Sequence, residues 1–114
     1  MKEITQIQKK VKRYELLLTK DVEEAEQNCD IYLEDLESLK KEINAQLYNI
    51  CVVIDNCCER RKRIFNTSNN IAVRSFKLKK VNFEIKRARK KVAEVTYLKS
   101  RVEDMKNKFK DLKK

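Results

Sequence analysis

The sequence contains no glycine and no proline, so it lacks the two residues that most often end helices and form tight turns. It also contains no histidine, the side chain most often used as a base near neutral pH and a common zinc ligand. Without glycine there is neither a phosphate-binding Gly-rich loop nor a nucleophile elbow. These absences predict a helical protein that is not an enzyme and needs no cofactor or metal.

Long hydrophobic runs are missing as well. The longest uninterrupted apolar stretch, residues 50–54, has five residues, whereas a membrane-spanning helix needs about 18 to 20. Residues near the N-terminus, among them Glu3, do not form the apolar core of a signal peptide. We therefore expect no transmembrane segment and a cytoplasmic location.

The cytoplasm is a reducing compartment, in which cysteines stay free thiols. The sequence has four cysteines that fit this location: Cys29, Cys51, Cys57 and Cys58. The adjacent pair Cys57 and Cys58 is badly placed for a disulfide within a helix. Without histidine or a C-x-x-C pair, a zinc site is not expected. Cys29 and Cys57 fall on the apolar stripe described next, so we expect them to be small buried apolar groups.

What the sequence does have is two long stretches in which apolar residues recur every three or four positions, the spacing of one helix face. With about two apolar positions in seven, each stripe has the width of a coiled-coil seam. The first stripe comprises Ile4, Ile7, Val11, Tyr14, Leu18, Val22, Ala25, Cys29, Tyr32, Leu36, Leu39, Ile43, Leu47, Ile50, Ile54 and Cys57, and the second Leu78, Val81, Ile85, Ala88, Val92, Val95, Leu98, Val102, Met105, Phe109 and Leu112. The pattern predicts an all-α fold of two long helices in an antiparallel coiled-coil hairpin.

The spacing of the first stripe is irregular at Tyr14, Leu18 and Val22, where two steps of four residues meet. Such a stutter changes the supercoil locally. We expect a bent or loosely wound coiled coil near this end of the first helix.

A single cluster of turn-forming polar residues, 66–70, separates the two stripes. Asn tolerates a left-handed backbone, so Asn66 is expected to end the first helix, and Ser68, Asn69 or Asn70 to cap the second. The prediction is one hairpin over residues 1–114, with helix one at about 3–64, a turn at 65–70 and helix two at about 70–113.

Charge divides the chain into three segments. Residues 1–20 have a balance of +4, residues 21–55 of −8 and residues 56–114 of +14. A chain that folds back at residues 66–70 brings acidic side chains of the first helix beside basic ones at the end of the second. The acidic set is Asp21, Glu23, Glu24, Glu26, Asp30, Glu34, Asp35 and Glu37, and the basic set is Lys99, Arg101, Lys106, Lys108, Lys110, Lys113 and Lys114. Complementary charges of this kind favour the antiparallel hairpin.

Basic residues around the expected turn exceed the acids available to neutralise them. They are Arg60, Arg61, Lys62, Arg63, Arg74, Lys77, Lys79 and Lys80, followed by Lys86, Arg87, Arg89, Lys90 and Lys91. Three interpretations remain open: a solvated face that keeps the protein soluble, a surface that docks on an acidic protein, or a contact with nucleic acid or anionic membrane.

Several apolar residues lie off the stripes and would be partly exposed on a bare hairpin. They are Leu16, Leu17, Leu33, Tyr48, Val52, Val53, Phe65, Phe76, Phe83 and Tyr97. Their concentration over residues 48–83 indicates either a face for self-association or a docking surface for another protein.

The sequence resembles the small central-stalk proteins of type III secretion systems, the YscO/FliJ family, and most of all the InvI/SpaM-type stalks of enterobacterial injectisomes. The resemblance is carried by the opening residues 4–7 (Ile-Thr-Gln-Ile) with Val11 and Arg13, the acid-rich middle of the first helix, and the strongly basic second helix. It covers nearly the whole chain and is one of architecture, not of a diagnostic motif. The composition, rich in Lys, Ile and Asn, is similar to that of proteins of the Shigella virulence plasmid.

The resemblance implies a non-enzymatic central stalk of a type III secretion ATPase complex, at the base of the secretion apparatus beside the inner membrane. Its partners would be the hexameric secretion ATPase, the cytoplasmic domain of the export gate and secretion chaperones, with neither a small-molecule substrate nor nucleic acid. The candidate ATPase contact is Lys9, Lys10, Arg13, Lys106, Lys108, Lys110 and Lys113, near both termini. The candidate gate or chaperone contact is Tyr48, Val52, Phe65, Phe76 and Phe83. The alternative is a generic basic coiled-coil protein, either a structural homodimer or a nucleic-acid-binding module.

Overall fold

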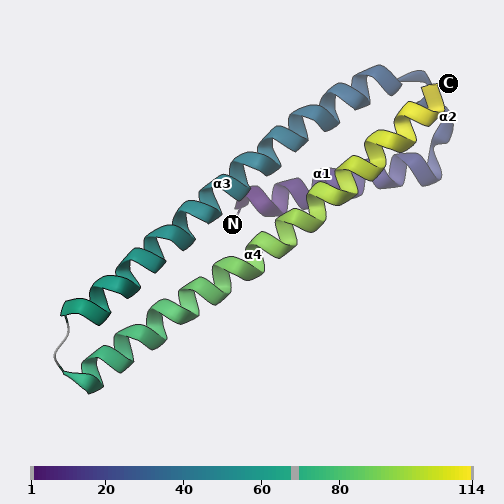
Figure 1. Cartoon of the computed structure of the whole chain (residues 1–114). Coiled ribbons are helices and arrows are strands. Elements are labelled where there is room, and N and C mark those ends of the chain that lie inside the picture. Colours follow the sequence, from purple (N-terminus) through teal and green to yellow (C-terminus); the bar gives the residue numbers. More distant parts are fainter. Residues whose placement is uncertain (1, 68–69, 114) are drawn as a thin grey trace. The chain divides into compact units, whose positions relative to one another are not determined.

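The computed structural model describes residues 2–67 and 70–113, and every regular element among them is an α-helix (Figure 1). The elements are α1 (Lys2–Lys20), α2 (Val22–Gln27), α3 (Cys29–Thr67) and α4 (Ile71–Lys113). Their contacts divide the chain into two compact units: unit 1, Met1–Gln46 with Val95–Lys114, and unit 2, Leu47–Glu94. Both α3 and α4 contribute to each unit.

Unit 1 is a three-helix bundle of α1, the first part of α3 and the last part of α4. Ion pairs of α3 with α4 join Asp30 to Lys113 at 2.7 Å and Lys40 to Glu103 at 2.7 Å, so these two helices run antiparallel. The buried side chains of unit 1 are Ile4, Ile7, Val11 and Tyr14 from α1, Ala25 from α2, Cys29, Leu36, Leu39 and Ile43 from α3, and Val95, Leu98, Val102, Met105 and Phe109 from α4. The antiparallel packing of two long helices, predicted from the two stripes, is confirmed.

The prediction of one continuous helix over residues 3–64 is wrong, because the chain leaves the helical path at Asp21 and again near Asn28. Asp21 caps α2: its carboxylate accepts a hydrogen bond from the backbone N–H of Glu24 at 3.4 Å. Between these points the chain reverses, so that α1 lies antiparallel to α3, with Lys10 beside Glu42 and Tyr14 beside Asp35. Val22, expected on the seam, is therefore 42% exposed.

The reversal has a physical cause in the unequal lengths of the two predicted helices. The last turn of α4 already lies beside the start of α3, where Lys113 pairs with Asp30. A straight continuation of α3 toward the N-terminus would leave the apolar stripe of α1 without a partner. Folding back buries Ile7 and Val11 to 2% and 0% exposure, and burying each such side chain is worth about 1.5–3 kcal/mol.

The described residues of unit 2 form two helical segments, residues 47–67 of α3 and the part of α4 before Val95. Cys57, Val81 and Ile85 form its core cluster, against which Cys58 and Ile64 pack. A two-helix coiled coil has a narrow seam, and the core of unit 2 is correspondingly small. The predicted burial of Cys29 and Cys57 is confirmed, and the exposed cysteine is Cys51.

The connection between α3 and α4 differs in part from the prediction. Asn66 does not end the first helix, since α3 continues to Thr67, whose hydroxyl donates to the backbone oxygen of Arg63 at 2.6 Å. Asn70 does cap α4, because its side-chain oxygen accepts from the N–H groups of Ala72 at 3.0 Å and Val73 at 3.3 Å. The predicted cap residues Ser68 and Asn69 lie outside the described residues.

Within residues 2–67 and 70–113, no helix is long and apolar enough to cross a bilayer. Every fully buried residue of both units lies on one of the two predicted stripes. The stripes therefore locate the core correctly, although α1 and α3 form separate helices.

Phe109 and Phe83 are a buried and an exposed phenylalanine, and substituting each of them tests which side chains stabilise the fold. Phe109 is fully buried in unit 1, with its ring centroid 5.6 Å from that of Tyr32, whereas Phe83 is 65% exposed. We expect Phe109→Ala to lower the free energy of unfolding by about 3–5 kcal/mol. The same change at Phe83 should alter it by about 0.5 kcal/mol or less. Urea unfolding followed by circular dichroism measures both, and equal losses would contradict the bundle described for unit 1.

Candidate functional site

All seven basic residues predicted to contact an ATPase lie in unit 1, but three of them form ion pairs with residues of α3. Lys10 pairs with Glu42 at 3.4 Å, Lys113 with Asp30 at 2.7 Å, and Lys106 with Glu37. The side chain of Lys106 is only 12% exposed. These three residues stabilise the packing of the helices, and a partner would have to compete for them.

The remaining four residues are more accessible. Lys9 and Arg13 are exposed and stand about one turn apart on α1, while Lys108 and Lys110 are exposed on the last turns of α4. The predicted residues of the two termini lie at different levels along unit 1. Lys10 and Lys113 pair with α3 residues that are twelve positions apart, which is about 18 Å along a helix.

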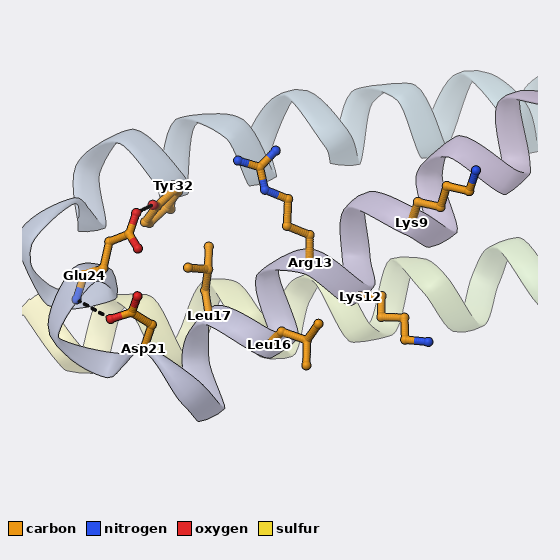
Figure 2. Close-up of a pocket in the computed structure, with 8 residues that line it drawn as sticks. All are labelled: Lys9, Lys12, Arg13, Leu16, Leu17, Asp21, Glu24 and Tyr32. Atoms are coloured by element: carbon orange, nitrogen blue, oxygen red, sulfur yellow. Dashed lines mark hydrogen bonds between the residues drawn. The ribbon is translucent and has the colours of Figure 1, made fainter.

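Lys9 and Arg13 line an open groove of about 570 Å³, which we name the N-terminal groove. Its other lining residues are Lys12, Leu16, Leu17, Asp21, Glu24 and Tyr32. Figure 2 shows the basic side chains along α1 and the acidic pair Asp21 and Glu24 where α1 gives way to α2. Tyr32 closes this end by donating its hydroxyl hydrogen to Glu24 at 3.0 Å. The groove is basic at one end, acidic at the other and apolar between them.

The five residues predicted for a gate or chaperone contact all lie in unit 2 and are all exposed: Tyr48, Val52, Phe65, Phe76 and Phe83. Tyr48 and Val52 stand one turn apart on α3, and Phe76 and Phe83 two turns apart on α4, so each pair shares a helix face. The guanidinium of Arg74 lies 6.0 Å from the centre of the Phe65 ring. A cation and an aromatic ring attract each other weakly, and this interaction holds both side chains at the surface.

The two units differ sharply in charge. Unit 2 has thirteen basic and four acidic residues, a balance of +9, whereas unit 1 has fifteen basic and fourteen acidic residues, a balance of +1. Nearly all of the net charge of +10 therefore belongs to the two-helix unit. Of the twelve large hydrophobic residues that are exposed in the described part of the chain, the same unit holds eight: Tyr48, Val52, Val53, Phe65, Ile71, Val73, Phe76 and Phe83.

A second groove, of about 330 Å³, lies within unit 2 between the end of α3 and the start of α4. We name it the hairpin groove, and it is lined by Arg60, Arg63, Ile64, Thr67, Lys77, Lys80, Val81 and Glu84. The sequence identified these basic residues as a cluster but not as the rim of a groove. Their spacing of three and four residues on both sides of the expected turn was the available signal.

The shifted carboxyl pKa values come from ion pairs between helices. A hydrogen bond from Lys106 lowers the pKa of Glu37, one from Arg60 lowers that of Glu84, and one from Lys40 lowers that of Glu103. A general acid at neutral pH needs the opposite shift, toward higher pKa. Among the described residues, no group of histidine, cysteine and carboxylate side chains could hold a metal ion. The arrangement offers ion pairing and apolar contact.

Comparison with known proteins gives no further guide, because no family model, curated protein or solved structure matches the chain. The resemblance to secretion stalks therefore stays a prediction from the sequence. What the structure adds is the placement of the candidate contacts: one set in the nearly neutral unit 1 and the other in the strongly basic unit 2.

Tyr14 reports on whether α1 packs against α3. Burial, together with a hydrogen bond donated to Asp35 at 3.0 Å, raises the pKa of Tyr14 from 10.0 to about 12. The unfolded chain loses this proton first as the pH rises, so the contribution of Tyr14 to stability is complete below pH 10 and disappears between pH 10 and about 12.

We therefore expect Tyr14→Phe to be less stable than the wild type at pH 8 by about 0.5–1.5 kcal/mol, the usual value of one hydrogen bond. The difference should shrink as the pH is raised from 10 toward 12. Urea titrations of both proteins over this range measure it. A difference that stays constant up to pH 12 would contradict the buried, hydrogen-bonded position of Tyr14.

Proposed function

We propose that this protein is a non-enzymatic central stalk of a type III secretion ATPase complex, which couples a hexameric ATPase to the export gate. The observation that carries the proposal is the division of the chain into two units with different surfaces. Unit 1 is nearly neutral and has the N-terminal groove, and unit 2 has a charge of +9 and most of the exposed apolar residues. A protein that couples two partners needs two such distinct contacts.

The ATPase contact would be made by the accessible basic residues of unit 1: Lys9, Arg13, Lys108 and Lys110. A bundle of three unequal helices has no six-fold symmetry, so inside a six-membered ring it can touch only some subunits at a time. Each touched subunit would be biased toward one conformation, which is a population shift by differential contact. Coupling of about 1–3 kcal/mol per contact is typical of such effects.

The gate or chaperone contact would be made by unit 2, through the exposed residues Tyr48, Val52, Phe65, Phe76 and Phe83. Aromatic side chains supply most of the binding energy in many protein interfaces. The surrounding positive charge would speed association with an acidic partner and select against basic ones. In this proposal the protein works at the cytoplasmic base of the secretion apparatus.

A specific alternative is nucleic-acid binding, which the charge of +9 on unit 2 favours. Binding of this kind weakens log-linearly with salt and depends little on sequence. Titration of labelled duplex DNA at increasing salt separates the two functions, as does affinity purification of the tagged protein from its native cell. Recovery of a hexameric ATPase and a gate component supports the stalk, and recovery of neither in low salt favours the alternative.

Charge reversal tests the ATPase contact. We expect Lys9→Glu/Arg13→Glu to raise the concentration needed for half-maximal stimulation of the co-purified secretion ATPase by roughly tenfold, because two exposed ion pairs are each worth about 0.2–1 kcal/mol. Lys86→Glu/Lys90→Glu is the matched control, since it changes the net charge equally but lies in unit 2. Helical content, measured by circular dichroism, should be the same in all three proteins. Unchanged stimulation by the first variant rules out this contact.

A further inference from the structure

The hairpin groove joins an apolar floor to a cationic rim. Ile64 and Val81 belong to the core of unit 2 and also line the groove, so part of that core is open at its surface. Around them stand the basic side chains of Arg63, Lys77 and Lys80. Apolar surface rimmed by polar or charged residues is a feature of ligand-binding grooves and protein interaction sites.

The one acidic residue of the groove is already neutralised. Glu84 pairs with Arg60 and also accepts a hydrogen bond from the thiol of Cys57 at 3.6 Å. The hydrogen bond from Arg60 lowers the pKa of Glu84, so this carboxylate stays ionised and paired. Among the described residues, Arg63, Lys77 and Lys80 form no ion pair. Three positive charges at the rim are therefore available to an anionic ligand.

The cationic rim continues into the exposed aromatic residues of α4. Phe76, Lys80 and Phe83 follow one another at steps of four and three residues, so they share one helix face. Phe76 and Phe83 are 72% and 65% exposed. A spacing of seven residues between the aromatic rings is the repeat with which one helix meets another in a coiled coil.

We propose that the hairpin groove and the flanking Phe76 and Phe83 bind an acidic amphipathic helix of a protein partner. An apolar side chain of that helix occupies the groove over Ile64 and Val81, and its carboxylates pair with the basic rim. The inference deepens the gate or chaperone contact proposed above and rests on it for the biological partner, while the chemistry of the groove is tested by itself.

The structure favours a helix over the other anionic partners of a basic surface. The phosphates of nucleic acid need cations but no apolar floor, and single-stranded bases need a platform of neighbouring rings. An anionic membrane binds helices with a continuous apolar face, whereas here Lys80 stands between Phe76 and Phe83. Helix-in-groove binding uses both the apolar floor and the charged rim.

The test uses the full chain and a fluorescein-labelled synthetic helix of about six turns, with leucine at heptad positions and glutamate around them. Fluorescence anisotropy should show saturable binding that weakens as salt is raised, because exposed charges are screened. Lys77→Glu/Lys80→Glu should weaken binding about tenfold or more, which corresponds to about 1.4 kcal/mol. The control Lys86→Glu/Lys90→Glu, with the same change in net charge on the same helix, should weaken it about threefold at most.

Two matched peptides test the two parts of the groove separately. Serine in place of the leucines should also weaken binding about tenfold or more, because the apolar contact is lost. Lysine in place of the glutamates should abolish it. Equal weakening by the two protein variants, or full affinity of the serine peptide, would show a diffuse charge effect and overturn the proposal.

The same full-length protein is also tested for binding to other classes of partner. Binding of duplex DNA or phosphatidylserine vesicles, with no binding of the acidic helix, overturns the inference, and so does a doubled mass in sedimentation with no peptide bound. The outcome is independent of the ATPase contact. Loss of ATPase stimulation in Lys9→Glu/Arg13→Glu with no peptide binding would retain the stalk and reject the groove, and the reverse result would retain the groove alone.

Discussion

A narrow apolar seam on every helix is the constraint on which the structure depends. A helix with two apolar positions in seven cannot bury them against itself, and it must find a partner of matching length. In unit 2 the two helices bury each other's apolar seams, and Cys57, Val81 and Ile85 form the core between them. In unit 1 the stripe of α1 would have had no partner on a straight path, and the reversal at Asp21 and Asn28 supplies one.

Charge then fixes which helices meet and in which direction. Arg101 in α4 donates two hydrogen bonds to the carboxylate of Glu15 in α1, and the distance from Nε to Oε1 is 2.5 Å. Lys113 forms an ion pair with Asp30 in α3. An ion pair at or near the surface contributes little to stability by itself. Their shared effect is orientation. Acidic and basic residues nearly balance in unit 1, so the surplus positive charge of the chain lies in unit 2. Packing and the candidate docking surfaces thus follow from one distribution of charge.

The helical fold, its buried residues and its antiparallel pairing could be predicted from periodicity and charge, because both properties are local in the sequence. Buried Val102 and Ile43 lie on the stripes, and Lys113 meets Asp30 as expected. The break at Asp21 was missed although its signals were present: an acidic cap with Glu24 three residues later, directly after a stutter at Tyr14 and Leu18. A helix pattern alone does not reveal a reversal, because the stripe keeps its phase across residues 21–28.

The candidate sites could be predicted only in part from the sequence, because the accessibility of a side chain depends on which helices pack around it. Lys10 and Lys9 are neighbours in the sequence, yet only Lys10 has Glu42 to pair with. The hairpin groove needs Arg63 of α3 and Lys77 of α4 on facing helices. The expected turn indicated that these basic residues cluster, but not that a groove lies between them.

The contact between Glu15 and Arg101 also has a consequence for how the chain folds. These residues are separated by 86 positions, whereas Arg60 and Glu84 in unit 2 are separated by 24. Closing the longer loop costs more conformational entropy, and contacts distant in sequence form slowly. On a ribosome, α1 is synthesised before α4, so its seam stays incomplete until the part of α4 around Arg101 has emerged. The helix α1 thus precedes its partner in synthesis and reaches its native contacts late.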